Sequence, residues 1–222
     1  MAIRKIMLTV VLASLFTTPA GAREAGDIMA RLTLLTSQPD VEGQSVNIQG
    51  GPQRDLEVAE DTMPALSGSY AFNQWVGVGL ATSLPLEHNL LMDDSSGVGS
   101  GLVGEFGTIS PHATLELYAP AVAGLHPWLG LGMHYTAFFE EDIRNQNARG
   151  IPSSARLEMD SSTGFVGRLG VDYDLGDWFI NASVSHFAIE TTTTIRDNGS
   201  TLAKKDLDLD PLQFQVGVAH RF

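Results

Sequence analysis

The end of the chain alternates between two kinds of side chain, and this feature constrains the fold most. In the segment 212–222 the even positions are mostly apolar or aromatic, whereas the odd positions are Gln, Gln, Gly, Ala and Arg. A period of two predicts a β-strand with one apolar face. The other face is polar or very small, which is typical of a strand with lipid on one side and a narrow polar interior on the other.

Similar alternation recurs upstream, although the segments 61–72 and 108–119 are less regular. Together these segments predict strands near 27–37, 61–72, 75–84, 108–119, 127–138, 163–174, 177–192 and 207–222. Short connections fall around 73–74, 120–126 and 174–177, and long polar ones around 38–60, 85–107, 139–162 and 193–206. Short turns at one end and long loops at the other characterise outer-membrane barrels. The sequence therefore predicts an all-β protein, an eight-stranded antiparallel transmembrane β-barrel with both termini at the short-turn end.

The N-terminal residues 1–22 have the pattern of a cleaved secretory signal. Arg4 and Lys5 precede an apolar stretch that is too short to span a membrane as a helix, and Ala20-Gly21-Ala22 gives a small-x-small cleavage site. A buried N-terminal helix is the alternative. We expect 23–222 to form the barrel and the signal to direct export to the bacterial outer membrane.

The tryptophans support the predicted orientation, with both termini and the short turns at one end of the barrel. Trp75, Trp128 and Trp178 each follow a short turn. Aromatic rings gather at membrane interfaces, so we expect a belt of aromatic side chains at that end. A soluble β-sandwich with these rings in its core is the alternative, and the export signal and the asymmetry of the loops favour the barrel.

Charge and cysteine content exclude several classes of function. Removal of Arg4 and Lys5 lowers the 13 basic residues to 11 against 26 acidic ones, a net charge of about −15, which argues against a nucleic-acid partner. The chain contains no cysteine, which excludes disulfides and thiolate metal sites. The histidines are scattered without metal-ligand spacing, and we expect neither a metal nor another cofactor.

Catalytic motifs are weak. The run Gly99 to Gly104 fits G-x-G-x-x-G but lacks the strand and helix that give this motif meaning. A lipid-modifying enzyme could use His88, Asp93, Asp94 and Ser95, but they share one loop without rigid positioning, so we expect no enzyme. Asp206, Asp208 and Asp210 share a strand face and could hold a divalent cation that bridges lipopolysaccharide; a solvated strand end is the simpler interpretation.

Several charged side chains should point into the barrel. By alternation these are Arg31, Glu116, Arg168, Asp172 and Arg221. The interior of an eight-stranded barrel is only wide enough for its own side chains. Charges in such a space must pair, since desolvation would otherwise be prohibitive. We therefore predict a plugged lumen rather than a wide water channel.

Several runs resemble the OmpW family, in order and spacing across the mature chain. They are Glu24-Ala25-Gly26 with Arg31, Pro127 to Gly132 with Tyr135-Thr136 and Phe138-Phe139, Gly170 to Tyr173 with Asp177-Trp178, Asn181 and Ser183-Val184, and Leu209-Asp210-Pro211 with the final Arg221-Phe222. His186 and His220 depart from the family, which has aromatic residues at those positions. The long loops show no close resemblance, which leaves the nature of the substrate open.

The resemblance implies passive uptake or binding of small hydrophobic molecules. In this family, which includes barrels implicated in alkane uptake, an apolar outer pocket is thought to release its cargo sideways into the membrane. Candidate pocket residues are Leu56, Met63, Leu91, Met92, Phe106, Phe139, Leu157 and Met159. Pro64 cannot donate a ladder hydrogen bond and is a candidate for loosening the wall.

The resemblance also implies partners and leaves one alternative function open. The C-terminal Phe222 resembles the signal read by the barrel-assembly machinery, and the expected surroundings are outer-membrane lipids and lipopolysaccharide. The alternative function is a structural or receptor-like surface barrel that supports the envelope and is used by phage or bacteriocins.

Overall fold

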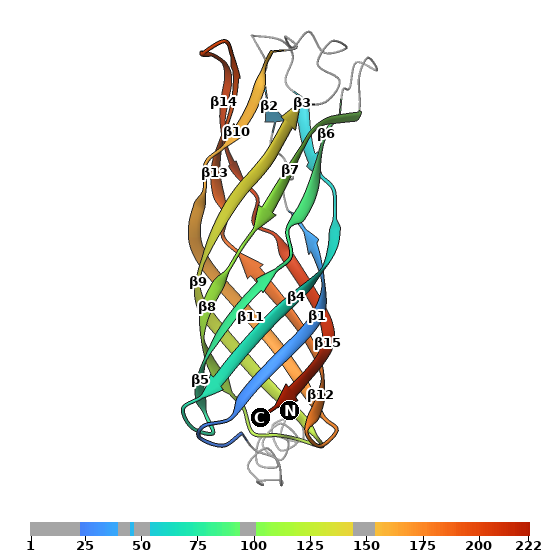
Figure 1. Ribbon diagram of the computed structural model, residues 1–222, viewed down its shortest axis with the longest axis vertical. Helices are drawn as coiled ribbons and strands as arrows, with labels where there is room; N and C mark the ends of the chain where they lie inside the picture. Colours follow the sequence, from blue (N-terminus) through green and yellow to red (C-terminus); the bar gives the residue numbers. More distant parts are fainter. Residues whose placement is uncertain (1–22, 40–44, 47–53, 94–100, 144–153) are drawn as a thin grey trace, which may run out of the picture.

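The computed structural model describes residues 23–39, 45–46, 54–93, 101–143 and 154–222, and these form one tall barrel (Figure 1). The predicted signal, residues 1–22, lies outside the described residues and stays a prediction. In the described part of the chain, no helix is long and apolar enough to cross a membrane.

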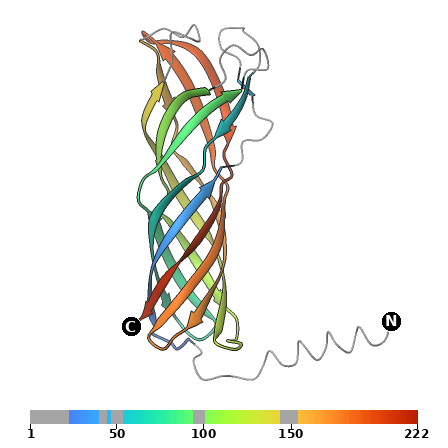
Figure 2. The ribbon, with the colours of Figure 1, turned by 90° about the vertical axis from the view of Figure 1, so that its right-hand side faces the viewer.

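Eight antiparallel strands form the closed lower wall, as the alternation predicts. Around the barrel they are β1 (Ile28–Gln38), β4 (Asp61–Ala71), β5 (Val76–Ser83), β8 (His112–Tyr118), β9 (Leu125–Ile143), β11 (Ser162–Asp174), β12 (Trp178–Phe187) and β15 (Leu212–Arg221). Pairing of β1 with β15, from Met29↔Arg221 to Gln38↔Leu212, closes the wall and leaves no free edge there. The start of β1, the C-terminus and the tight turns lie at the same end of the barrel (Figure 2).

Where the structure describes the long connections, they are largely strand rather than loop, which corrects the sequence prediction. Above the eight strands, the wall continues as β2 (Ser45–Val46), β3 (Arg54–Val58), β6 (Leu86–Asp93), β7 (Gly101–Ile109), β10 (Arg156–Met159), β13 (Glu190–Asp197) and β14 (Ser200–Asp208). The β13–β14 hairpin shows why. Asn198 and Gly199 both have positive φ, as a two-residue hairpin turn requires, and the flanking Thr-rich strand is a good β-former.

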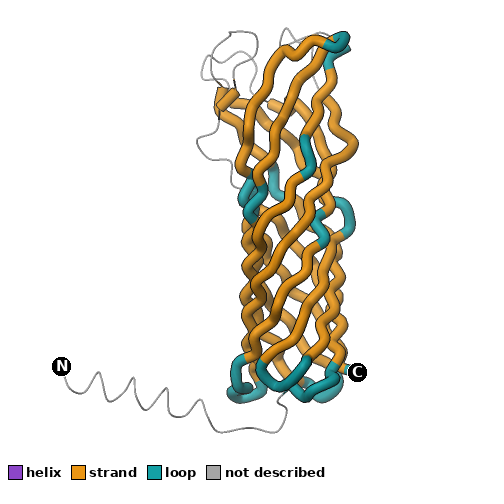
Figure 3. The backbone as a smooth tube through the Cα atoms, turned by 90° about the vertical axis from the view of Figure 1, so that its left-hand side faces the viewer, coloured by secondary structure: helices purple, strands orange, loops and turns teal. Residues whose placement is uncertain are grey.

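The strand breaks gather at mid-height, a level that we call the waist (Figure 3). Breaks fall at residues 39, 84–85, 110–111, 160–161, 188–189 and 209–211, and four of them contain proline: Pro39, Pro85, Pro111 and Pro211. Below the waist the outer surface carries the large exposed hydrophobic side chains, including Leu80, Leu131, Phe165 and Val216. None of those found on the described residues lies above it. The apolar band that meets lipid therefore ends at the waist.

One tryptophan corrects the predicted aromatic belt. Trp75 and Trp178 are 48% and 55% exposed at the turn end, whereas Trp128 is 2% exposed and faces the lumen. Trp128 precedes the outward-facing Leu129, so alternation turns its ring inward. Space for the ring comes from Gly170 on β11, where a Cβ atom would collide with it.

A charge on the lipid face should destabilise the barrel, whereas one above the waist should not. Leu131→Arg lies near the middle of the apolar band and should cost about 2–4 kcal/mol of folding free energy. Thr201→Arg, at an exposed position on β14, is the matched control. Urea unfolding of each variant in lipid vesicles measures the difference. Equal stability of the two variants would show that the membrane does not end at the waist.

Candidate functional site

A buried cluster of charges fills the lower lumen. The carboxylate of Asp172 on β11 accepts hydrogen bonds from Arg31 at 2.8 Å and from Asn181 at 2.7 Å, and it also pairs with Arg23. These four side chains come from β1, β11, β12 and the segment before β1, and all are nearly inaccessible to solvent. The cluster therefore connects β1, β11 and β12 across the lumen. We call it, together with Trp128 and Arg168, the plug.

The remaining predicted lumen charges take other partners. The guanidinium groups of Arg31 and Arg168 each lie 5.1 Å from the centre of the Trp128 ring, and Nε of Arg168 donates to Ser185 at 3.3 Å. Glu116 accepts a hydrogen bond of 3.0 Å from the hydroxyl of Tyr118. Arg221 lies over the ring of Phe179 at the turn end. Cation–π contacts therefore take the place of some of the expected ion pairs.

The inward position of Arg23 could not be predicted from alternation. It precedes the first strand, so alternation along a strand could not assign it an inward direction. Its guanidinium lies 4.2 Å from the centre of the Tyr118 ring as well as against Asp172. The only hint in the sequence is an arginine directly after the predicted cleavage site.

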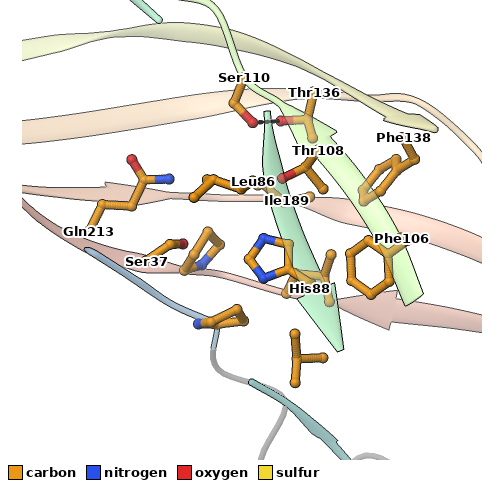
Figure 4. Close-up of a pocket in the computed structure, with 14 residues that line it drawn as sticks. Ser37, Leu86, His88, Phe106, Thr108, Ser110, Thr136, Phe138, Ile189 and Gln213 are labelled. Atoms are coloured by element: carbon orange, nitrogen blue, oxygen red, sulfur yellow. Dashed lines mark hydrogen bonds between the residues drawn. The ribbon is translucent and has the colours of Figure 1, made fainter. Parts of the chain in front are cut away.

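Above the plug, at the waist, lies a narrow pocket inside the barrel (Figure 4). Its lining comes from six strands and the breaks beside them: Ser37, Pro39, Val58, Leu86, His88, Phe106, Thr108, Ser110, Thr136, Phe138, Ile189, Leu209, Pro211 and Gln213. Its free space is about 20 Å³, which is room for one water-sized group. We call it the waist pocket.

The waist pocket is apolar on one side and polar on the other. Phe106 forms ring contacts with His88 and Phe138, with centroids 5.3 Å and 6.0 Å apart. On the polar side, the hydroxyls of Ser110 and Thr136 form a hydrogen bond of 2.8 Å. Burial lowers the pKa of His88, so its imidazole is neutral at neutral pH.

Six of the eight predicted pocket residues divide into three groups. Phe106 lines the waist pocket. Met63 and Met159 lie one layer behind it, since Met63 packs against the cluster containing Leu86 and Met159 against the cluster containing Ile189 and Leu209. The side chains of Leu56, Leu91 and Met92 lie outside the described part of the structure.

Two predicted residues lie elsewhere, for identifiable reasons. Phe139 packs over Gly107, and its neighbour Phe138 lines the pocket instead, because adjacent residues of a strand face opposite sides. Leu157 packs with Ala155 and Ile195 in a separate cluster on the upper strands. Both corrections follow from strands within the segment 139–162, where the sequence predicts a loop: β9 continues to Ile143, and β10 begins at Arg156.

The wall beside the waist pocket is interrupted. Pairing of β5 with β8 ends at Ala81↔His112, and pairing of β6 with β7 begins at Leu86↔Thr108. Between these pairs lie residues 82–85 and 109–111, which belong to neither of these two ladders. We call these residues the window. On the side of residues 82–85 that faces β4, the carbonyl oxygen of Pro64 accepts a hydrogen bond of 3.0 Å from the amide of Leu84. Pro64 has no N–H to donate in return.

An apolar groove lies on the outer surface of the wall at the same height. Its volume is about 740 Å³, and its lining includes the exposed side chains of Leu66, Leu80 and Met133. Thr82 and Pro111, two residues of the window, also line it. Ser110, the residue before Pro111, lines the waist pocket on the inside. The pocket and the groove therefore adjoin the same break in the wall.

The candidate residues for catalysis and cation binding lie only partly within the described structure. His88 faces the waist pocket, whereas Asp94 and Ser95 lie outside the described residues. Asp206 accepts a hydrogen bond from Thr192, and Asp210 accepts one from the amide of Ile189. Among the residues that the structure describes, no group of three or more His, Asp or Glu side chains could hold a metal ion. Phe222 is 73% exposed at the turn end.

Comparisons with known proteins agree with this architecture. The sequence profile of the OmpW family matches residues 24–222. Outer membrane protein W of Vibrio cholerae is 28% identical over 214 residues, 96% of each chain, and that of Salmonella typhimurium is 30% identical over 216 residues, 95% of each chain. The crystal structure of OprG from Pseudomonas aeruginosa has a TM-score of 0.77 at 26% identity and covers 90% of this chain and 98% of OprG. The solid-state NMR structure of AlkL in lipid bilayers shares the fold, with a TM-score of 0.67 at 18% identity over 93% of this chain and 95% of AlkL.

Removal of the plug carboxylate should strongly destabilise the barrel. Asp172→Asn leaves Arg23 and Arg31 buried without their counter-charge, which should cost about 3–5 kcal/mol. Asp174→Asn is the matched control, since Asp174 is partly exposed and lies 3.5 Å from His126. The urea midpoint in lipid vesicles measures both variants. A similar small loss in the two variants would contradict a structural role for the Asp172 cluster.

Proposed function

The chain belongs to the OmpW family of bacterial outer-membrane barrels, and from this premise we propose that it mediates passive uptake of small hydrophobic molecules. Cargo enters from the end of the barrel opposite the tight turns and occupies the waist pocket. It then leaves sideways through the window into the outer membrane. The observation that carries the proposal is the position of the apolar pocket, directly above the plug and beside an interruption of the wall.

The plug makes the sideways route the easier one. An apolar molecule that continued down the lumen would have to separate Asp172 from Arg31 and Arg23, which would leave buried charges without partners. A molecule that leaves through the window breaks no ladder hydrogen bond between residues 82–85 and 109–111. It then meets the apolar outer groove and the hydrocarbon beyond, where its transfer free energy is favourable.

The membrane and the cell supply the other partners in this proposal. The apolar band below the waist is in contact with outer-membrane lipids, and the polar strands above it cross the lipopolysaccharide layer. The exposed C-terminal Phe222 is the group that we assign to recognition by the barrel-assembly machinery. Residues 1–22 are assigned to the export signal.

A specific observation favours a second candidate function. The free space of the waist pocket, about 20 Å³, is far smaller than an alkane, so uptake requires the lining side chains to move. A pocket that stays filled would fit a surface barrel that supports the envelope or serves as a receptor for phage or bacteriocins.

A charge placed in the waist pocket should abolish uptake. Ile189→Asp puts a carboxylate among the apolar side chains of the lining, and the initial rate of uptake of labelled decane by intact cells should fall by about tenfold or more. Ile195→Asp is the matched control, because Ile195 is also buried but belongs to a cluster on the upper strands. Correct assembly is checked by heat-modifiable migration. If the wild type takes up decane no faster than cells without the chain, the second candidate function is favoured.

Closing the window should slow release. The backbone amide of Leu84 points toward Pro64. Because successive backbone amides of a strand point to opposite neighbours, an N–H at position 85 would point toward residues 109–111. Pro85→Val supplies a missing N–H on the side of the window, and one added ladder bond there should slow decane uptake about fivefold. Pro64→Val adds its N–H toward Leu84, on the β4 side of the same strand, and tests whether the wall must loosen there as well. Pro127→Val, at the turn end of β9, is the control and should leave uptake unchanged. Unchanged uptake in all three variants would remove the window from the route.

A further inference from the structure

The polar side of the waist pocket offers groups that an alkane cannot use. We infer that, within the uptake function proposed above, Ser37, Thr108 and Gln213 bind the oxygen-bearing head of an uncharged amphiphile, such as a long-chain primary alcohol. The inference rests on that proposed function and specifies its substrate class. A hydrocarbon chain of the same molecule lies along the apolar side.

The three polar side chains are buried and face the pocket from different parts of the wall. They belong to β1, β7 and β15, and their exposed fractions are 1% for Ser37, 6% for Thr108 and 4% for Gln213. Figure 4 shows them around the same space as Leu86 and His88. Within the described chain, none of the three side chains has a hydrogen-bond partner, whereas the neighbouring Ser110 and Thr136 bond to each other.

Unpartnered polar groups in such a position indicate what the site binds. A hydroxyl or amide that lines free space and has no hydrogen bond within the protein can bond to a ligand oxygen placed in that space. The amide of Gln213 and the hydroxyls of Ser37 and Thr108 can each donate or accept, so they suit an alcohol or a carbonyl group. The free space of about 20 Å³ matches one hydroxyl group.

The opposite side of the pocket suits a hydrocarbon chain. Phe106, Phe138, Ile189 and Leu209 line it, and Met159 lies directly behind the last two. These residues bring no polar side-chain atom to that side. Methionine has three rotatable bonds, and a chain that enters can displace it at low cost. The lining therefore offers both hydrogen-bonding groups and apolar side chains, as the binding of an amphiphile requires.

Charge around the pocket excludes anionic heads. The lining contains no Lys, Arg, Asp or Glu, and its one titratable residue, His88, is kept neutral by burial. His88 and Phe106 are shared with an adjoining polar cavity of about 640 Å³. That cavity is lined by five carboxylate residues: Glu60, Asp61, Glu87, Glu105 and Glu140. A fatty carboxylate or a phosphate would meet repulsion beside the pocket and no cation inside it.

The test compares three ten-carbon molecules in intact cells. Labelled 1-decanol, decane and decanoate are supplied to cells with the wild type, the double variant Thr108→Val/Gln213→Leu, or Gln215→Leu. Gln215 is the matched control, since it lies on the same strand and the same face as Gln213, is equally buried and lies outside the pocket. The double variant should lower the rate ratio of decanol to decane about fivefold or more, and Gln215→Leu should not change it.

Each other outcome has a definite meaning. If the double variant slows both molecules equally or neither, or if decanoate enters faster than decanol, the polar-head assignment is wrong while hydrophobic uptake stands. If the wild type accelerates neither molecule, the uptake function fails, and direct binding decides the assignment. In that case the side-chain amide signals of Gln213, in the full chain in lipid nanodiscs, should shift with 1-decanol and not with decane. Unshifted signals would overturn the assignment.

Discussion

The interior of an eight-stranded barrel has room only for its own side chains, and the rest of this structure depends on how that space is filled. In the lower half it holds charge: Asp172 joins Arg31 and Arg23, and Trp128 lies between Arg31 and Arg168. Glycines such as Gly170, which have no Cβ atom, leave the space that these large side chains occupy. The same apolar outer band that fixes the barrel in lipid makes each unpaired charge inside it costly, so the plug is both a requirement of the fold and a barrier to passage.

With the lumen filled, a route for apolar cargo has to leave through the wall, and the waist is where the wall is weakest. Proline cannot complete a ladder hydrogen bond, and Pro64, Pro85 and Pro111 surround one interruption of the strand pairing. The waist pocket lies on the inner side of this interruption, and the apolar groove on its outer side. The end of the lipid-facing band at the same height would let cargo meet hydrocarbon as soon as it left the wall.

Alternation predicted the strand number, the closure and the orientation of the barrel, because a period of two can be recognised directly in the sequence. It failed above the waist, where Thr-rich and charged strands such as β13 face water on one side and lack the apolar signal of lipid-facing strands. With a strand end predicted at 138, alternation gives Phe139 no direction, whereas β9 continues to Ile143 and turns Phe138, not Phe139, into the pocket. The inward direction of Arg31 and Asp172 could be read from alternation, but their contact could not, since it depends on the register of strands far apart in the chain.

We propose that apolar cargo passes from the waist pocket through the wall and does not cross the plug. The most direct measurement is a crystal structure with a bound 1-bromoalkane, because anomalous scattering locates bromine independently of the protein atoms. The account predicts bromine peaks in the waist pocket and beside residues 82–85 and 109–111, and none among Arg31, Asp172 and Arg168. A line of peaks down the lumen past Trp128 would contradict it.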